Sequence, residues 1–263
     1  MKQEYSFTWG RPAAGALLIM LLGSAVAGCN NDAEILPNPG PEYYPLAVGA
    51  YRIYDVADTT WRNNVPTASR FQFREQVAAE LTPDATGQPV YRVIRSRRAT
   101  ATDAWAVDSV LTVTVGKNFL TEQRSNRRSV ELVFPVVENK SWSNTGFYAP
   151  DTAKQVNREP TRFYRAVGEP FTIASGTKQF SYENTVTVTN DLSTPFIFPT
   201  DPGGPNINNK TTNIVRATFA KGIGPVYRYK RSIDHCSING GSCDRRNFII
   251  GQSRREVLVE SGQ

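Results

Sequence analysis

The cysteines and the histidine of this 263-residue chain limit the chemistry that it can perform. There are three cysteines and one histidine, His235, so almost every metal site built from several imidazoles is excluded. A Ser-His-Asp or Cys-His catalytic site would depend on that one imidazole, which stands beside Cys236. A pair of carboxylates for glycoside hydrolysis stays open, because such a pair is assembled in space and leaves no local motif. We expect no enzyme, no cofactor and no metal, with a glycan-degrading hydrolase as one alternative.

Two cysteines near the carboxyl end are spaced for a disulfide. Cys236 and Cys243 flank the segment Asn239-Gly240-Gly241, which is a strong signal for a tight turn. Such a turn brings two thiols within bonding range, and we predict that they pair outside the cytosol. A zinc site is the alternative, although the Cys-x-x-Cys pairs of common structural sites are absent. Its ligands would come from Asp234, His235, Cys236, Cys243 and Asp244.

Arginine is the preferred basic residue, with 22 Arg against 8 Lys and a net charge of +6. The simpler interpretation places these arginines on solvated outer faces of strands, where charge also protects exposed edges. The alternative is a face that binds anions, such as the phosphates of lipopolysaccharide or acidic glycans. The clusters are Arg95, Arg97 and Arg98; Arg124, Arg127 and Arg128; Arg245 and Arg246; and Arg254 and Arg255.

The elements that must position these side chains are predicted to be strands. Apolar and polar residues alternate with period two in almost every periodic segment, as in Phe71, Phe73 and Val77, or in Tyr227 and Tyr229 around Arg228. We expect an all-β fold of roughly ten to twelve strands, in a single antiparallel meander sheet curved into a barrel or half-barrel. A two-sheet β-sandwich is the alternative.

A long loop rich in proline, glycine and asparagine interrupts this pattern over residues 191 to 213. Loops of this length in compact domains tend to be either functional or disordered. Phe196, Ile197 and Phe198 form an apolar triplet in it, which we take as a candidate binding loop. Either the triplet packs onto the domain as a lid, which we favour, or it presents a contact surface to a partner.

The first thirty residues have the three parts of an export signal. Lys2 and Arg11 precede an uncharged stretch of 15 residues over 13–27, too short to span a bilayer as a helix. The segment Val26-Ala27-Gly28-Cys29 that follows resembles the lipobox of bacterial lipoproteins, which implies a lipid on Cys29. We divide the chain into a signal peptide (1–28), a lipidated Pro- and Asn-rich tether (29–46) and a single antiparallel β domain (47–263).

A second resemblance covers both ends of the β domain. Residues 44–54, with Pro45-Leu46-Ala47-Val48-Gly49, resemble the Pro-Leu-x-x-Gly opening of uncharacterised Bacteroidetes-type outer-membrane lipoproteins. Residues 219–226 resemble their Gly-x-Gly-x-Val segment. The resemblance implies a β-rich lipoprotein of the cell envelope, and Asn30 after the cysteine implies the outer membrane, on its periplasmic or surface face.

These observations together predict a non-enzymatic binding or scaffolding protein. Its composition, 40% hydrophobic and 21% charged, excludes a multi-span membrane protein and wholesale disorder. The expected partners are the membrane, through the lipid, and an envelope protein, lipid or glycan. We expect no nucleic acid, because of the compartment, and the oligomeric state stays open. Besides the hydrolase, the alternative is a lipid or acyl-chain carrier with a half-barrel cavity.

Overall fold

The computed structural model describes residues 40–62, 65–147, 161–191, 212–236 and 248–263. These residues belong to one compact unit, Asn38–Gln263, and the segment Met1–Pro37 is separate from it. Within the described ranges there is one short 3₁₀ helix and no α-helix, so no helix there is long and apolar enough to cross a membrane. The elements are η1 (Pro41–Tyr43), β1 (Tyr51–Arg62), β2 (Val65–Leu81), β3 (Val90–Arg98), β4 (Ala106–Val115), β5 (Phe119–Arg124), β6 (Arg127–Val133), β7 (Ser141–Ser143), β8 (Thr161–Ser175), β9 (Lys178–Thr189), β10 (Thr212–Ala220), β11 (Gly224–Cys236) and β12 (Phe248–Gly262).

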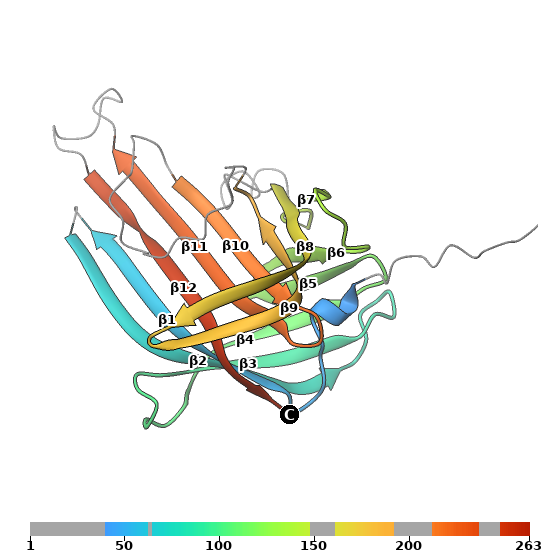
Figure 1. Ribbon diagram of the computed structural model, residues 1–263. Coiled ribbons are helices and arrows are strands. Elements are labelled where there is room, and N and C mark those ends of the chain that lie inside the picture. Colours follow the sequence, from blue (N-terminus) through green and yellow to red (C-terminus); the bar gives the residue numbers. More distant parts are fainter. Residues whose placement is uncertain (1–39, 63–64, 148–160, 192–211, 237–247) are drawn as a thin grey trace, which may run out of the picture. The chain divides into compact units, whose positions relative to one another are not determined.

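The strands form a single antiparallel sheet in which consecutive strands pair with each other, except β6 and β7, which are its two edges (Figure 1). The order is β6-β5-β4-β3-β2-β1-β12-β11-β10-β9-β8-β7, so the first and the last strand of the chain meet in the middle. The predicted all-β meander is therefore confirmed.

The sheet curves until it is a nearly closed barrel, and its two edge strands then approach each other. The backbone N–H of Val130 on β6 donates to the carbonyl oxygen of Asn144, just after β7, at 3.0 Å. The indole Nε1 of Trp142 on β7 donates to the carbonyl oxygen of Val130, also at 3.0 Å. These bonds connect edge strands that would otherwise expose unpaired backbone groups.

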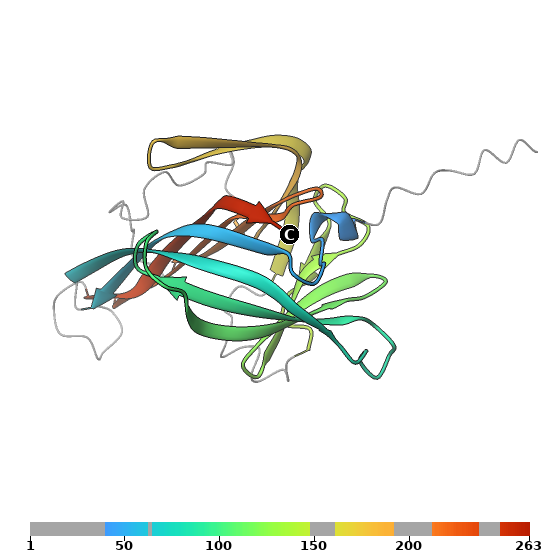
Figure 2. The same ribbon diagram turned by 90° about the horizontal axis from the view of Figure 1, so that it is seen from below.

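The hairpin of β8 and β9 bends away from the barrel wall and lies over the outer face of β11 and β12 (Figure 2). Ala166 and Gly168 have positive φ angles of 54° and 81°, and the β8–β9 register shifts between Arg165 and Glu169. The ring of Phe171 on β8 lies 5.7 Å from that of Tyr227 on β11. Apolar residues are thereby buried on the outer side of the wall as well as on its inner side.

One end of the barrel interior is filled by side chains, including two from the segment that precedes β1. Tyr43 and Tyr44 are buried there, so residues that the sequence assigned to the tether pack within the β domain. The buried members of this cluster are Tyr43, Tyr44, Val77, Val93, Leu111, Val113, Leu120, Leu132, Phe134, Tyr164, Val186, Val188 and Phe219.

The two segments that resemble lipoprotein motifs meet at this end. Nε of Arg52 on β1 donates to the carbonyl oxygen of Ile223, and Nη2 donates to that of Pro45, both at 2.7 Å. Gly224 has a φ angle of +100°, and a Cβ atom there would lie 2.7 Å from Nη2 of Arg52. Glycine is thus required both by the backbone and by the guanidinium against it. The turn before Gly224 joins β10 to β11.

Candidate ligand-binding cavity

A network of buried charges lies in the barrel interior beyond the apolar end. Strand register places Glu75 on β2, Arg95 on β3, Arg228 on β11 and Glu256 on β12 on the inner face. Nη2 of Arg95 lies 2.6 Å from Oε1 of Glu75 and 3.1 Å from Oε2 of Glu256. Nη1 of Arg228 lies 3.0 Å and 3.2 Å from the same two oxygens. Each carboxylate therefore receives two guanidinium groups, which compensates the cost of burying it.

These contacts shift the ionisation of the two carboxyls. Burial by itself would raise the pKa of Glu75, but Arg228, Arg95 and Arg124 outweigh it and hold that pKa well below the usual range. The pKa of Glu256 is lowered in the same way, because Arg95 and Arg228 outweigh its burial. Both groups are ionised at neutral pH.

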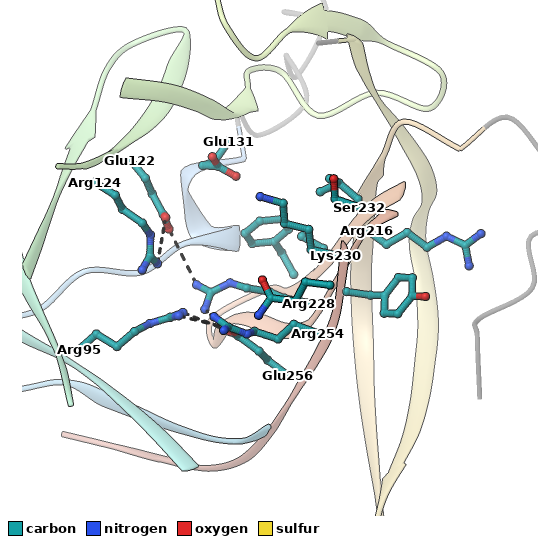
Figure 3. A pocket seen from close by; sticks show the side chains of 15 residues that line it. Arg95, Glu122, Arg124, Glu131, Arg216, Arg228, Lys230, Ser232, Arg254 and Glu256 are labelled. Atoms are coloured by element: carbon teal, nitrogen blue, oxygen red, sulfur yellow. Dashed lines mark hydrogen bonds and ion pairs between the residues drawn. The ribbon is translucent and has the colours of Figure 1, made fainter. Parts of the chain in front are cut away.

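A third carboxylate extends the network toward a cavity. The hydroxyl of Tyr44 donates to Oε1 of Glu122 on β5 at 2.7 Å. Nη2 of Arg124 lies 3.5 Å from Oε2 of Glu122, and Nη2 of Arg228 lies 3.8 Å from its Oε1 (Figure 3). Glu122 thus connects the filled end of the barrel to its charged middle.

The cavity above this network has two adjoining chambers. The inner chamber encloses about 440 Å³ and is bounded by the network, and the outer chamber encloses about 620 Å³. The side chains of Arg124, Glu131, Val215, Lys230 and Ser232 line both. Volumes of this order suit a small-molecule ligand.

The wall of the outer chamber is polar, with Val215 as its one apolar member among the described residues. The lining residues are Arg124, Ser125, Arg127, Ser129, Glu131, Asn144, Arg162, Asn213, Val215, Lys230 and Ser232. This composition favours a polar ligand over an acyl chain.

Two facing groups in this wall have shifted ionisation. Burial and the nearby charge of Glu122 raise the pKa of Glu131 on β6. Partial loss of water lowers the pKa of Lys230 on β11, and the positive charges of Arg162, Arg254 and Arg127 lower it further. Loss of water is the largest cause of this shift, and the three arginines add to it.

Arg254, which also lines the inner chamber, is paired with a carboxylate outside the network. Nη2 of Arg254 on β12 lies 2.9 Å from Oδ2 of Asp58 on β1, and Nε2 of Gln252 donates to the same carboxylate. Arg216, by contrast, points away from the cavity and pairs with Asp191 (Figure 3).

The preferred interpretation of the arginine clusters was wrong for several of their members. Arg95 is 5% exposed, and Arg124, Arg127 and Arg254 line the cavity instead of standing on solvated outer faces. The physical reason is that the barrel interior contains carboxylates that the alternation pattern did not reveal. Arg97 lies over Phe71, Arg98 over Trp105, Arg128 contacts Thr121 and Arg255 contacts Ala174, so these four do not join the cavity.

The basic residues of β11 face the barrel interior, and its tyrosines face outward. Tyr227 and Tyr229 alternate with Arg228 and Lys230 as predicted, and the basic pair faces the barrel interior. The tyrosines are buried on the outer face, under the β8–β9 hairpin. One signal in the sequence pointed to an interior position for Arg228. Glu75 stands between Phe73 and Val77 on the apolar face of β2, and a buried carboxylate there needs a basic partner inside the barrel.

Several predicted sites lie outside the described residues. They are Cys29, the apolar triplet Phe196, Ile197 and Phe198, Cys243, and Arg245 and Arg246; the side chain of Cys236 is likewise not described. The disulfide and the candidate binding loop therefore remain predictions. Among the residues that the structure describes, no group of three or more His, Cys, Asp and Glu side chains is arranged to hold a metal ion.

Comparison with known proteins identifies no family. No protein-family model matches the chain, and no curated protein matches it. A crystal structure from Parabacteroides distasonis, of a protein provisionally described as a lipoprotein, is similar to this chain with a TM-score of 0.36. The two sequences are 10% identical, and the match covers 84% of this chain and 98% of that chain. A similarity of this degree establishes neither an activity nor a ligand.

Proposed function

We propose that this protein is a lipid-anchored lipoprotein of the outer membrane whose β domain binds a small polar ligand inside the barrel, without catalysis. The observation that carries the binding role is the two-chambered cavity, which is lined by charged side chains from β3, β5, β6, β11 and β12. A purely structural barrel would have little reason to keep such a polar interior, because burying charges costs several kcal/mol per ion before pairing.

The polar wall counts against the alternative of an acyl-chain carrier. A carrier of that kind needs a continuous apolar cavity, whereas charged and polar side chains make up most of the lining of both chambers. The chambers lie beside the charged network, at the level of Arg228 and Glu256.

A glycan-degrading hydrolase is the second candidate, and one observation favours it. Glu131 and Glu122 both line the inner chamber, and the raised pKa of Glu131 is the property that a general acid needs. Glu122, however, is held by Tyr44, Arg124 and Arg228, so it serves the buried network. We therefore favour binding. Release of reducing sugar from an acidic glycan, abolished by Glu131→Gln, would establish the hydrolase instead.

The cavity is tested by filling it. Val215 lines both chambers, so Val215→Trp should occupy them, while Val110→Trp adds the same bulk at a position that is 50% exposed on β4. Detergent-solubilised full-length protein is titrated by calorimetry with pyrophosphate, glucose 6-phosphate, maltotriose and palmitate. We expect a polar probe to bind the unaltered protein and Val110→Trp, and not Val215→Trp. Failure of all three polar probes to bind, or equal binding by both variants, would contradict the proposal.

The anchor is tested separately. The Cys29→Ser variant should lose the lipid mass and leave the outer-membrane fraction, whereas the unaltered chain should lose residues 1–28 and gain lipid on Cys29. A product of the unaltered gene that carries no lipid in a competent bacterium would refute the anchor while leaving the cavity proposal intact.

A further inference from the structure

Some charged side chains of the cavity wall are paired with a side chain of opposite charge, and others are not. In the inner chamber, the carboxylates of Glu75, Glu256 and Glu122 face the guanidinium groups of Arg95, Arg228 and Arg124. Arg254 is compensated by Asp58. The inner chamber is therefore close to neutral, and its arginines are already engaged with carboxylates.

The outer chamber is not balanced in this way. Arg127 and Lys230 line it, and within the described part of the chain no hydrogen bond or ion pair engages either head group. Arg162 contributes a further positive charge to the same wall, which the lowered pKa of Lys230 reflects. Glu131 is the one carboxylate among the described lining residues of this chamber. Positive charge therefore exceeds negative charge here even when Arg162 is left out of the comparison.

Keeping uncompensated cations together is unfavourable unless something else balances them. Both side chains are exposed to solvent, so water and salt screen part of their mutual repulsion. An anion between Arg127 and Lys230 would remove that repulsion and gain charge-assisted hydrogen bonds from both head groups. The guanidinium group offers a planar fork for two oxygens, and the ammonium offers a point charge.

We propose that the outer chamber binds a polar small molecule with at least two anionic oxygens on a phosphate or carboxylate group, such as a phosphorylated sugar, between Arg127 and Lys230. This inference rests on the proposed function and specifies the ligand of the same cavity. Hydroxyl and amide groups of Ser232 and Asn213 in the wall are suited to the uncharged part of such a molecule. The volume of about 620 Å³ leaves room for a sugar beside the anion.

The chain contains a matched control for the test. Arg127 and Arg128 are neighbours on β6, but Arg128 points to the other face, where Nε donates to the hydroxyl of Thr121 and the guanidinium lies over Phe147. Arg127→Gln and Arg128→Gln therefore remove the same charge from inside and outside the chamber. Lys230→Gln is the second inside variant, and circular dichroism with thermal melting checks that all three remain folded.

Glucose 6-phosphate, pyrophosphate and glucose are titrated into detergent-solubilised full-length protein at fixed ionic strength. We expect the two phosphates to bind and glucose to bind at least tenfold more weakly than its phosphate. Arg127→Gln and Lys230→Gln should each weaken phosphate binding by about tenfold or more, the effect of losing one hydrogen bond to a charged group. Arg128→Gln should change it by less than about twofold, because the guanidinium of Arg128 lies outside the chamber, over Phe147 and near Asp84.

The outcomes separate this inference from the proposed function. If glucose binds as tightly as its phosphate and Val215→Trp abolishes both, the cavity proposal stands and the anion site is wrong. Equal losses in Arg127→Gln and Arg128→Gln would also overturn the anion site, since the effect would then be the overall charge of the surface. If no probe binds, both proposals fail.

The source of the anion is resolved by a further arm of the experiment. Phosphatidylcholine vesicles with and without a diphosphorylated disaccharide lipid are mixed with the Cys29→Ser variant, so that the anchor does not attach the protein to every vesicle, and are separated by flotation. Flotation that depends on that lipid and is lost in Lys230→Gln identifies a lipid head group as the ligand. Binding of glucose 6-phosphate with no such flotation identifies a free sugar phosphate, and either result supports the anion site.

Discussion

Arg228 and Glu75 are 153 residues apart in sequence, yet Nη1 of the arginine lies 3.0 Å from Oε1 of the glutamate in the middle of the barrel. The pair connects β11 to β2, two strands that are not neighbours in the sheet. Their contact therefore spans the two strands between them, β1 and β12, on the inner face of the sheet. This interaction belongs to the charged network beside the inner chamber, and it also links two strands that do not pair in the sheet.

Removing the carboxylate should destabilise the fold strongly. In Glu75→Gln, Arg95 and Arg228 keep their positive charges but lose their shared partner, and breaking a buried ion pair costs about 3 to 5 kcal/mol. We expect a free energy of unfolding lower by that amount in guanidinium denaturation. Glu80→Gln, at an exposed position of the same strand, is the control and should change it by less than about 0.5 kcal/mol. Equal small effects in the two variants would show that the network contributes nothing to stability.

The same network predicts how stability depends on pH. The pKa values of Glu75 and Glu256 are lowered by folding, so these groups bind fewer protons in the folded state than in the unfolded one. Their contribution is present in full above the unfolded pKa, about 4.3, and is lost as the pH falls through the lower folded values. Denaturation curves between neutral and acidic pH should show this decline. In Glu256→Gln the decline should be shallower, and an unchanged slope would contradict the assignment.

Anion binding in the outer chamber should strengthen as the solution is made mildly acidic. The raised pKa of Glu131 means that it takes up a proton at a higher pH than an exposed glutamate does. The groups around it, Glu122, Arg162 and Arg228, add one negative and two positive charges to its surroundings, and Lys230 stays protonated in this range. Protonation then removes the negative charge that repels the ligand. Titrations with pyrophosphate should show this rise in the unaltered protein and lose it in Glu131→Gln, with the ligand's own ionisation corrected for. A rise of equal size in that variant would exclude Glu131 as its cause.

The glycine beside Arg52 should not accept a side chain. Gly224→Ala places a methyl group 2.7 Å from the guanidinium and also forces a non-glycine residue to a φ angle of +100°. Gly87→Ala is the matched control, because its φ angle is +78° and nothing lies within 4 Å of the added atom. The control should lose roughly 1 to 2 kcal/mol from the backbone alone. We expect a larger loss in Gly224→Ala by thermal melting, and equal losses would mean that Arg52 moves aside freely.

The disulfide between Cys236 and Cys243 remains a prediction from the sequence. Peptide mapping without reductant should recover the two cysteine peptides joined, and an unstrained bond should stabilise the fold by about 2 to 3 kcal/mol. Complete alkylation of both thiols in native protein would show that they do not pair.

The sequence predicted the strands well because alternation of polar and apolar residues is a local property. Phe71, Phe73 and Val77 share one face of β2, as their spacing indicated. The site was not predictable in the same way, because it depends on pairs such as Arg228 and Glu75 that only the folded sheet brings together. The orientation of β11 was not predictable for a similar reason. Tyr227 and Tyr229 are buried on the outer face because the β8–β9 hairpin packs on them, and the local sequence of β11 does not show this contact.

The position of the last strand has a consequence for the order of folding. β12 pairs with β1 along its whole length, with Asp58 opposite Arg254, residues that are 196 positions apart. The strands β1 to β6 and β7 to β12 each form a meander of local pairings, and within the sheet the two halves pair with each other at β1 and β12. Because contacts of such long sequence separation form slowly, this pairing is the late step of assembly. A growing chain can therefore pair β1 with β2 early, but it completes the sheet only when β12 becomes available to pair with β1.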